Sequence, residues 1–193
     1  MRVLMVYAHP VETSFCAALK ERALKALVAR GHEVEVLDLY EQGFDPVLTR
    51  AERLAYHDVP ENRAGVAPEV EQLQRAEALV LVYPVWNFGF PAILKGYLDR
   101  VFLPGVSFRM EKGRAKPNLQ HIRRLVAITT YGGARWRAFV LGDPPRRIVR
   151  RVLRSLVAPT ARLAYLAQYD LNSADAATRT AFLERVEAEM ARV

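Results

Sequence analysis

Two almost continuous apolar runs constrain the fold of this chain more than any other feature of its sequence. Residues 2–9 (RVLMVYAH) and 78–83 (ALVLVY) carry scarcely any polar side chain after their first residue. Such runs are typical of β-strands that are buried on both faces, as in a parallel sheet covered by helices. The rest of the chain must therefore supply helices for both faces of a sheet.

Segments with helical spacing follow the apolar runs. Residues 14–30 place apolar side chains three or four positions apart, and Gly31 suits the end of that helix. Residues 32–39 (HEVEVLDL) alternate between apolar and polar, which indicates a strand near a sheet edge. We predict further helices at residues 68–77, 91–102, 148–156 and 174–191, and further strands at residues 122–130 and 161–168.

The alternation of strands and helices predicts an α/β fold with a parallel sheet and helices on both faces. With five strands, the natural architecture is flavodoxin-like, with strand order 2-1-3-4-5. The chain has 193 residues and shows no internal repeat, so we expect one domain, 1–193. Residues 40–66 and 103–119 are longer than typical connections.

The composition of the chain limits its possible binding partners and its possible cellular compartment. The formal charge of +7, concentrated in residues 135–154, indicates a nucleic acid, an anionic lipid or a phosphorylated small molecule as partner. Cys16 is the only cysteine, which excludes an intrachain disulfide and a multi-cysteine metal site and fits a reducing compartment. The chain has neither a signal-peptide core nor a run of about 18 apolar residues. We therefore expect a cytoplasmic location, no membrane insertion and no metal.

Four arginines raise the question of nucleic-acid binding. Arg147, Arg150, Arg151 and Arg154 are spaced i, i+3, i+4 and i+7, which would place them on one face of a helix. A solvated helix face is the alternative interpretation. Because no interleaved aromatic residues or known binding module accompany them, we predict no nucleic-acid partner.

In an open parallel sheet, ligands bind outside the carboxyl ends of the strands. The first loop at that edge, AHPVETSF, contains neither a GxGxxG nor a Walker motif. It places Thr13 and Ser14 at a helix N-terminus, where hydroxyl and backbone N–H groups bind phosphate. The alternative is that Thr13 or Ser14 only caps the helix and that His9 is satisfied locally at the strand end.

Two more loops are expected at the same edge. The second, PVWNFGFP, offers Trp86 and Phe88 to a planar ring, unless both aromatics pack into the core. The third, TTYGGARWR, offers hydroxyls and two glycines that permit close backbone approach, unless it is merely a tight turn. The three loops together indicate an aromatic, nucleotide-like ligand.

Four segments resemble a known family in order and in spacing. They are AHPVETSF (8–15), LDLYEQGFDPVLTR (37–50), YPVWNFGFPAILKGYLDRVFLPGVSF (83–108) and ITTYGGA (128–134). They resemble the NAD(P)H:quinone oxidoreductases, a family that includes the flavin-binding ancillary subunits of bacterial potassium-efflux systems. The resemblance covers about the first 134 residues.

The resemblance implies a non-covalent FAD or FMN, NAD(P)H as co-substrate, and two-electron reduction of quinones or similar acceptors by ping-pong hydride transfer. It also implies a homodimer with both subunits at each active site. Carried over by position, the phosphate portion of the flavin would be held by His9, Thr13, Ser14, Phe15 and Cys16. The isoalloxazine ring would be lined by Pro84, Val85, Trp86, Asn87 and Phe88, and its polar edge by Thr129, Thr130, Gly132 and Gly133, with the inserted Tyr131 beside them.

The chain also departs from the family pattern. Asn87 stands where a tryptophan often does, and the Tyr and His that follow the glycines in the quinone reductases are absent. Arg135, Trp136 and Arg137 occupy that region instead. One hypothesis is that Arg135 or Arg137 stabilises the reduced flavin or binds a phosphate of the dinucleotide; the alternative is a solvent-facing arginine. Tyr131 is a further candidate catalytic residue.

Two other functions remain open at the level of sequence. An electron-carrier flavodoxin is one, although such carriers are typically acidic and this chain is basic. A regulatory flavin-binding subunit of a transporter is the other. In both, turnover of NAD(P)H with a quinone would be absent or incidental.

Overall fold

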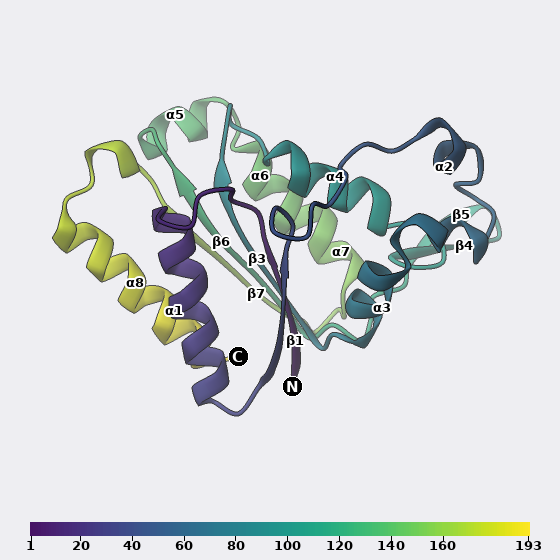
Figure 1. Ribbon diagram of the computed structural model, residues 1–193, viewed down its shortest axis with the longest axis horizontal. Helices are drawn as coiled ribbons and strands as arrows, with labels where there is room; N and C mark the ends of the chain where they lie inside the picture. Colours follow the sequence, from purple (N-terminus) through teal and green to yellow (C-terminus); the bar gives the residue numbers. More distant parts are fainter.

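The computed structural model describes all 193 residues. Its centre is a parallel sheet of five strands in the order β2-β1-β3-β6-β7 (Figure 1). Numbered along this sheet alone, that order is 2-1-3-4-5, so the predicted architecture is confirmed. The strands are β1 (Arg2–Tyr7), β2 (Glu33–Asp38), β3 (Ala78–Val85), β6 (Arg124–Tyr131) and β7 (Arg162–Gln168).

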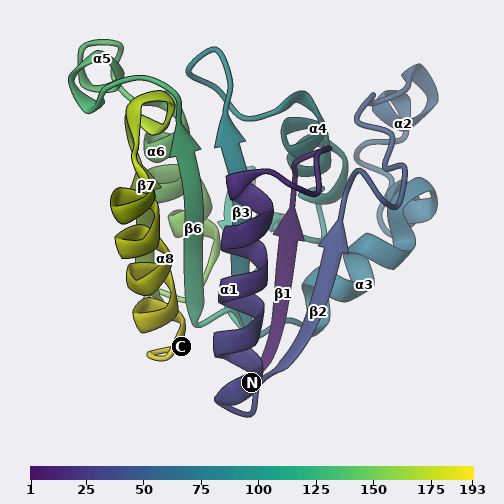
Figure 2. The ribbon, with the colours of Figure 1, turned by 60° about the vertical axis from the view of Figure 1, so that its left-hand side comes forward.

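Helices cover both faces of this sheet, as Figures 1 and 2 show. One face carries α1 (Phe15–Ala29) and α8 (Ala176–Met190). The other carries α3 (Ala67–Arg75), α4 (Ala92–Val101) and a helix that runs without a break through α6 (Pro144–Arg147), the π-helical η2 (Ile148–Leu153) and α7 (Arg154–Leu156). None of the helices is long and apolar enough to cross a membrane.

The two faces of β1 explain its unbroken apolar run. Val3 and Met5 pack with α1 and α8, whereas Leu4 and Val6 belong to the separate apolar cluster beneath α3 and α4. Successive side chains of a strand point to opposite faces, so a strand between two helical layers needs apolar residues at every position. By contrast β2, which alternates, lies at the predicted sheet edge.

Local signals in the sequence fix both ends of α1. The Ser14 hydroxyl accepts a hydrogen bond from the Ala17 N–H and caps the N-terminus. At the other end Gly31 has a φ of +76°, and the Gly31 and His32 N–H groups donate to the carbonyls of Val28 and Leu27. This is a Schellman motif, which confirms the predicted role of Gly31.

The two long connections contain structure that the sequence analysis left undefined. Residues 40–66 form α2 (Arg50–Leu54) and the 3₁₀-helix η1 (Glu61–Val66). Buried Arg100 of α4 anchors this segment through the Glu52 carboxylate and the Asp45 carbonyl. Residues 103–119 include an antiparallel hairpin, β4 (Phe108–Glu111) and β5 (Arg114–Pro117).

The segment after β6 is helical, although the sequence analysis treated it as a loop. It contains α5 (Arg135–Val140), and a short 3₁₀-helix, η3 (Leu171–Ser173), follows β7. The predicted helix at residues 148–156 begins earlier, at Pro144, and includes a π-helical turn. The other element ends differ from those predicted by at most two residues.

Candidate functional site

The loops that follow β1, β3 and β6 emerge at the same edge of the sheet (Figure 2). The His9 ring, from the first loop, meets the Trp86 ring of the second edge-on, with ring centroids 5.8 Å apart. The strands that precede these two loops are neighbours in the sheet, which brings the loops together. The predicted convergence of the first two loops is therefore present.

The first loop presents free backbone donors at the start of α1. The N–H groups of Phe15 and Cys16 have no partner within the chain, whereas the Ser14 hydroxyl already accepts from Ala17. The loop borders a cavity of about 790 Å³, whose wall includes exposed Thr13 and the acidic side chains of Glu12, Glu21, Asp38 and Glu41. Free N–H groups at the positive end of a 15-residue helix attract anions. Ser14 is thus a cap, as the alternative held, and the anion-binding feature is the backbone beside it.

His9, Phe15 and Cys16 lie in this loop with different roles. The His9 Nδ1 accepts the Val11 N–H at 3.0 Å, and burial lowers the pKa of the ring. The Phe15 ring packs against Phe182 of α8. The Cys16 side chain is buried, and burial raises the pKa of its thiol to about 12. Phe15 and Cys16 therefore offer the site their backbone N–H groups and not their side chains.

The second loop is a tight turn that holds two aromatic side chains in solvent. Trp86 and Gly89 exchange backbone hydrogen bonds of 3.2 and 2.8 Å across Asn87 and Phe88, which have φ values of +48° and +58°. Trp86 is 42% exposed and Phe88 is 36% exposed. Neither aromatic packs into the core, so the core-packing interpretation is wrong. The left-handed backbone of the turn turns both rings outward.

The residues on either side of that turn lie deeper. Pro84 is buried in β3 opposite Thr130, and Val85 is half-buried against the core. Thr129 and Thr130 are buried, and the Thr129 hydroxyl has no hydrogen-bond partner. These residues form the floor of the site rather than its rim.

The two glycines of the third loop differ in their surroundings. A side chain on Gly132 would come 3.1 Å from the Asn172 amide nitrogen, so this glycine permits close packing against the segment after β7. A side chain on Gly133 would meet only Arg137 Cδ, at 3.9 Å. Gly133 thus leaves open space beside the end of β6.

Tyr131 ends β6 with its side chain pointing into the protein. Its hydroxyl donates to Asp143 Oδ1 at 2.5 Å and lies 2.7 Å from the Tyr165 hydroxyl. The Tyr169 hydroxyl donates to Asp143 Oδ2 at 2.9 Å, and the Tyr169 ring stacks on Tyr131 with centroids 4.4 Å apart. Burial raises the pKa of Tyr131, so its phenol stays protonated at neutral pH.

Asp143 and Tyr169 were not singled out by the sequence analysis. A signal for Asp143 does exist in the run Gly142-Asp143-Pro144-Pro145, which is typical of a turn before a helix. In the structure Gly142 and Asp143 both have positive φ values. Nothing local in the sequence identifies the partner of this carboxylate.

The arginines after the third loop divide into two groups. Arg135 lines a cavity together with Arg146, Arg147, Arg150 and Arg151. Arg137, by contrast, lies with its guanidinium carbon 5.4 Å from the Trp136 ring centroid and outside that cavity. Of the two arginines proposed beside the glycines, only Arg135 joins the basic cluster.

The prediction that four arginines share one face of a helix is wrong for Arg154. The Arg154 guanidinium turns away and donates to the carbonyls of Ala158 and Pro159 at 3.0 and 2.5 Å. The intervening turn, Ile148–Leu153, is π-helical, so α-helical spacing does not describe this segment. These carbonyls follow the end of the helix, where a basic side chain in the last turn can donate to them.

Comparison with known proteins agrees with this fold. A family described as having a flavodoxin-like fold matches residues 1–187. NAD(P)H dehydrogenase [quinone] 1 of Cavia porcellus is 33% identical over 147 residues, which are 68% of this chain and 54% of the relative. The chain thus spans about half the length of the curated relatives that it matches.

Solved structures extend the likeness to the whole chain. Smu.1420 from Streptococcus mutans has a TM-score of 0.86 and 26% identity, with all of both chains covered. An NAD(P)H:quinone oxidoreductase from Methanothermobacter marburgensis has a TM-score of 0.81 and 25% identity, with 99% of this chain and 98% of the other covered.

Proposed function

This chain belongs to the flavodoxin-like NAD(P)H:quinone oxidoreductase family, and from that membership we propose that it is a flavin-dependent NAD(P)H oxidoreductase. The proposed reaction takes a hydride from NAD(P)H and a proton from solvent and reduces a quinone to a hydroquinone, releasing NAD(P)⁺. The proposal also covers other two-electron acceptors that resemble quinones and would be reduced in their place. The observation that carries it is the contact between the anion-binding first loop and the aromatic second loop at one sheet edge.

The chain's own residues fit a flavin at this edge. The free N–H groups of Phe15 and Cys16 suit its phosphate end, and exposed Thr13 adds a hydroxyl. Trp86 and Phe88 offer apolar area to a planar ring, and Gly133 leaves room beside it. These groups lie in the loops that follow three neighbouring strands or in the first turn of α1, so the sheet sets the spacing between them.

When bound, the flavin supplies the redox chemistry, since it can accept a hydride and pass on two electrons. The chain then needs to bind, orient and exclude water, and it needs no nucleophile. Trp86 and Phe88 would exclude water from one side of the site. Tyr131, with its hydroxyl bonded to Asp143 inside the protein, positions the third loop and does not reach a substrate itself.

The cofactor is proposed to be FAD or FMN, bound without a covalent link. Purified protein should be yellow, and heat-released cofactor identified by mass should be one of these two flavins, at about one per chain. A colourless protein that takes up neither flavin on reconstitution would overturn the proposal.

We also propose a homodimer. Trp86 and Phe88 are exposed in the second loop, and Trp136 and Val140 of α5, which follows the third loop, are 64% and 71% exposed. Apolar surface of this kind is commonly covered by a second subunit. Sedimentation should give about twice the chain mass of 21.8 kDa. A monomer at micromolar concentration that retains flavin would contradict this assembly.

A further inference from the structure

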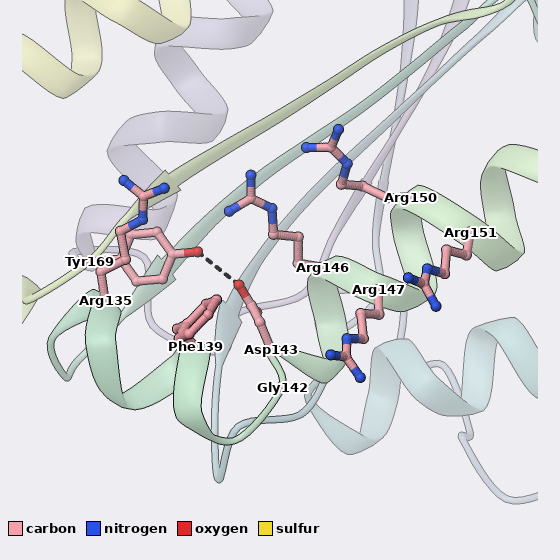
Figure 3. A pocket seen from close by; sticks show the side chains of 9 residues that line it. All are labelled: Arg135, Phe139, Gly142, Asp143, Arg146, Arg147, Arg150, Arg151 and Tyr169. Atoms are coloured by element: carbon pink, nitrogen blue, oxygen red, sulfur yellow. Dashed lines mark hydrogen bonds between the residues drawn. The ribbon is translucent and has the colours of Figure 1, made fainter.

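A second cavity, which shares no lining residue with the cavity beside the first loop, is lined by nine residues, and five of them are arginines. Its volume is about 460 Å³, within the range of small-ligand sites. The five arginines come from α5 (Arg135), α6 (Arg146 and Arg147) and the π-helical turn η2 (Arg150 and Arg151). Figure 3 shows them around one hollow, with Tyr169, Asp143 and Phe139 beside them.

None of these five guanidinium groups has a carboxylate partner. The ion pairs of the structure involve none of them. The single acidic residue in the cavity wall, Asp143, already accepts hydrogen bonds from the Tyr131 and Tyr169 hydroxyls. Five like charges around one hollow repel each other unless an anion lies between them.

Two of the five cationic side chains are also held in place. The guanidinium carbon of Arg146 lies 5.6 Å from the Tyr165 ring centroid. A side chain on Gly142 would come 3.3 Å from Arg147 Nη1, so the guanidinium packs against a backbone that only glycine leaves open at a φ of +80°. A cation stacked on an aromatic ring or packed on backbone loses less entropy when it binds an anion.

The π-helical turn contributes to this arrangement. Arg146 with Arg150, and Arg147 with Arg151, extend in pairs from successive turns of the helix (Figure 3). Arg154 is turned away onto the Ala158 and Pro159 carbonyls. Single π-turns within helices are frequent at functional sites.

We propose that this cavity binds a pyrophosphate-bearing ligand. Guanidinium groups bind phosphate oxygens through paired N–H donors, and the five of them exceed what a single carboxylate ligand would need. Exposed Phe139 and the Tyr169 ring offer apolar area at the same cavity, which suits a nucleotide. The pyrophosphate belongs either to the dinucleotide reductant, in which case the inference rests on the proposed function, or to a separate nucleotide.

The test measures the heat of binding of inorganic pyrophosphate to the protein. The protein is first saturated with FMN, so that the anion-binding first loop is already occupied. Arg150→Gln/Arg151→Gln is the informative variant because both side chains are exposed and form no ion pair within the protein. Arg179→Gln/Arg185→Gln on α8 is the matched control, with the same loss of charge at exposed positions. We expect the cavity variant to bind pyrophosphate about tenfold or more weakly, and the control to bind as the wild type does.

The same titration with NADP⁺, which carries no hydride, separates the two sources. If the cavity variant also loses affinity for NADP⁺, the pyrophosphate is that of the dinucleotide; if NADP⁺ binding is unchanged, the ligand is a separate nucleotide. Absence of pyrophosphate binding in the wild type, or equal weakening in the control, would overturn the inference. If the protein failed to bind flavin, the proposed function would be wrong. The inference about the arginine cavity would still be testable, because the experiment measures heat of binding and not turnover.

Discussion

The Tyr131 hydroxyl donates to Asp143 Oδ1 at 2.5 Å and thereby ties the end of β6 to the turn before α6. The same carboxylate also holds the Tyr169 hydroxyl, just beyond the end of β7. One residue thus joins the third loop of the proposed flavin-binding edge to the wall of the arginine cavity. Two sites that differ in chemistry share this support.

Replacing Tyr131 by Phe should destabilise the protein. The change removes a half-buried hydrogen bond to a charged acceptor, which costs about 1.5–3 kcal/mol of unfolding free energy. Denaturant unfolding monitored by circular dichroism measures this. Tyr40→Phe, which removes a hydroxyl with no recorded partner, should change stability by less than about 0.5 kcal/mol. Equal losses in the two variants would show that the Asp143 contact contributes nothing.

Stability should decline at alkaline pH. Burial raises the pKa of the Cys16 thiol from 9.0 to about 12 and the pKa of the Tyr7 phenol from 10.0 to about 12. The folded state therefore holds these protons more tightly than the unfolded state. Their contribution is complete below the ordinary pKa values and is lost as pH rises toward 12. Denaturant midpoints measured across this window should fall as pH rises.

The thiol offers an independent check of the same burial. Because Cys16 is the only cysteine, any alkylation reports on this residue alone. Iodoacetamide at neutral pH should label the folded protein far more slowly than the unfolded protein, since the thiolate is the reactive form. Rapid labelling of the folded protein would show that the thiol is accessible and ionised.

Replacing Trp86 by Ala should weaken flavin binding by about tenfold, because an aromatic contact contributes about 0.5–1.5 kcal/mol beyond its buried area. The dissociation constant follows from quenching of flavin fluorescence. Val28→Ala removes an exposed apolar side chain at the end of α1 remote from the three loops, and should leave flavin affinity unchanged. Unchanged flavin affinity in the Trp86 variant would show that the flavin ring does not bind against Trp86.

Replacing Gly96 by Ala should destabilise the protein by about 2 kcal/mol. A β-carbon at this position in α4 would overlap the ring and the carbonyl oxygen of Pro46. Alanine improves helix propensity by about 1 kcal/mol, but overpacking against backbone costs about 3 kcal/mol or more. Lys95→Ala, which breaks only an exposed ion pair with Asp99, should cost less than about 0.5 kcal/mol. Thermal or denaturant unfolding of both variants tests the ranking.

Initial rates with NAD(P)H and a quinone should give parallel double-reciprocal lines. Only one aromatic turn, Trp86 to Gly89, flanks the proposed site, so we expect reductant and acceptor to occupy it in alternation. Intersecting lines would indicate that both bind at once. Absence of turnover with any quinone would favour an electron carrier or a regulatory subunit.

The layered fold could be predicted from the sequence alone. The unbroken apolar runs of β1 and β3 require helices on both faces, and Ser14 and Gly31 act within a few residues of themselves to begin and end α1. Such signals are local, so they can be read without knowledge of the rest of the chain. The position of the second loop beside the first followed from strand order alone.

The contacts between side chains far apart in the chain could not be predicted and became visible in the three-dimensional fold. Tyr131 looks like a ligand-contacting residue in sequence, but its hydroxyl turns inward because Asp143 and Tyr165, 12 and 34 residues away, lie within reach. Arg154 leaves its predicted helix face for two carbonyls that a π-helical turn and a chain reversal bring close. A polar side chain takes the partner that packing places nearest, and packing is fixed by contacts between elements far apart in the chain.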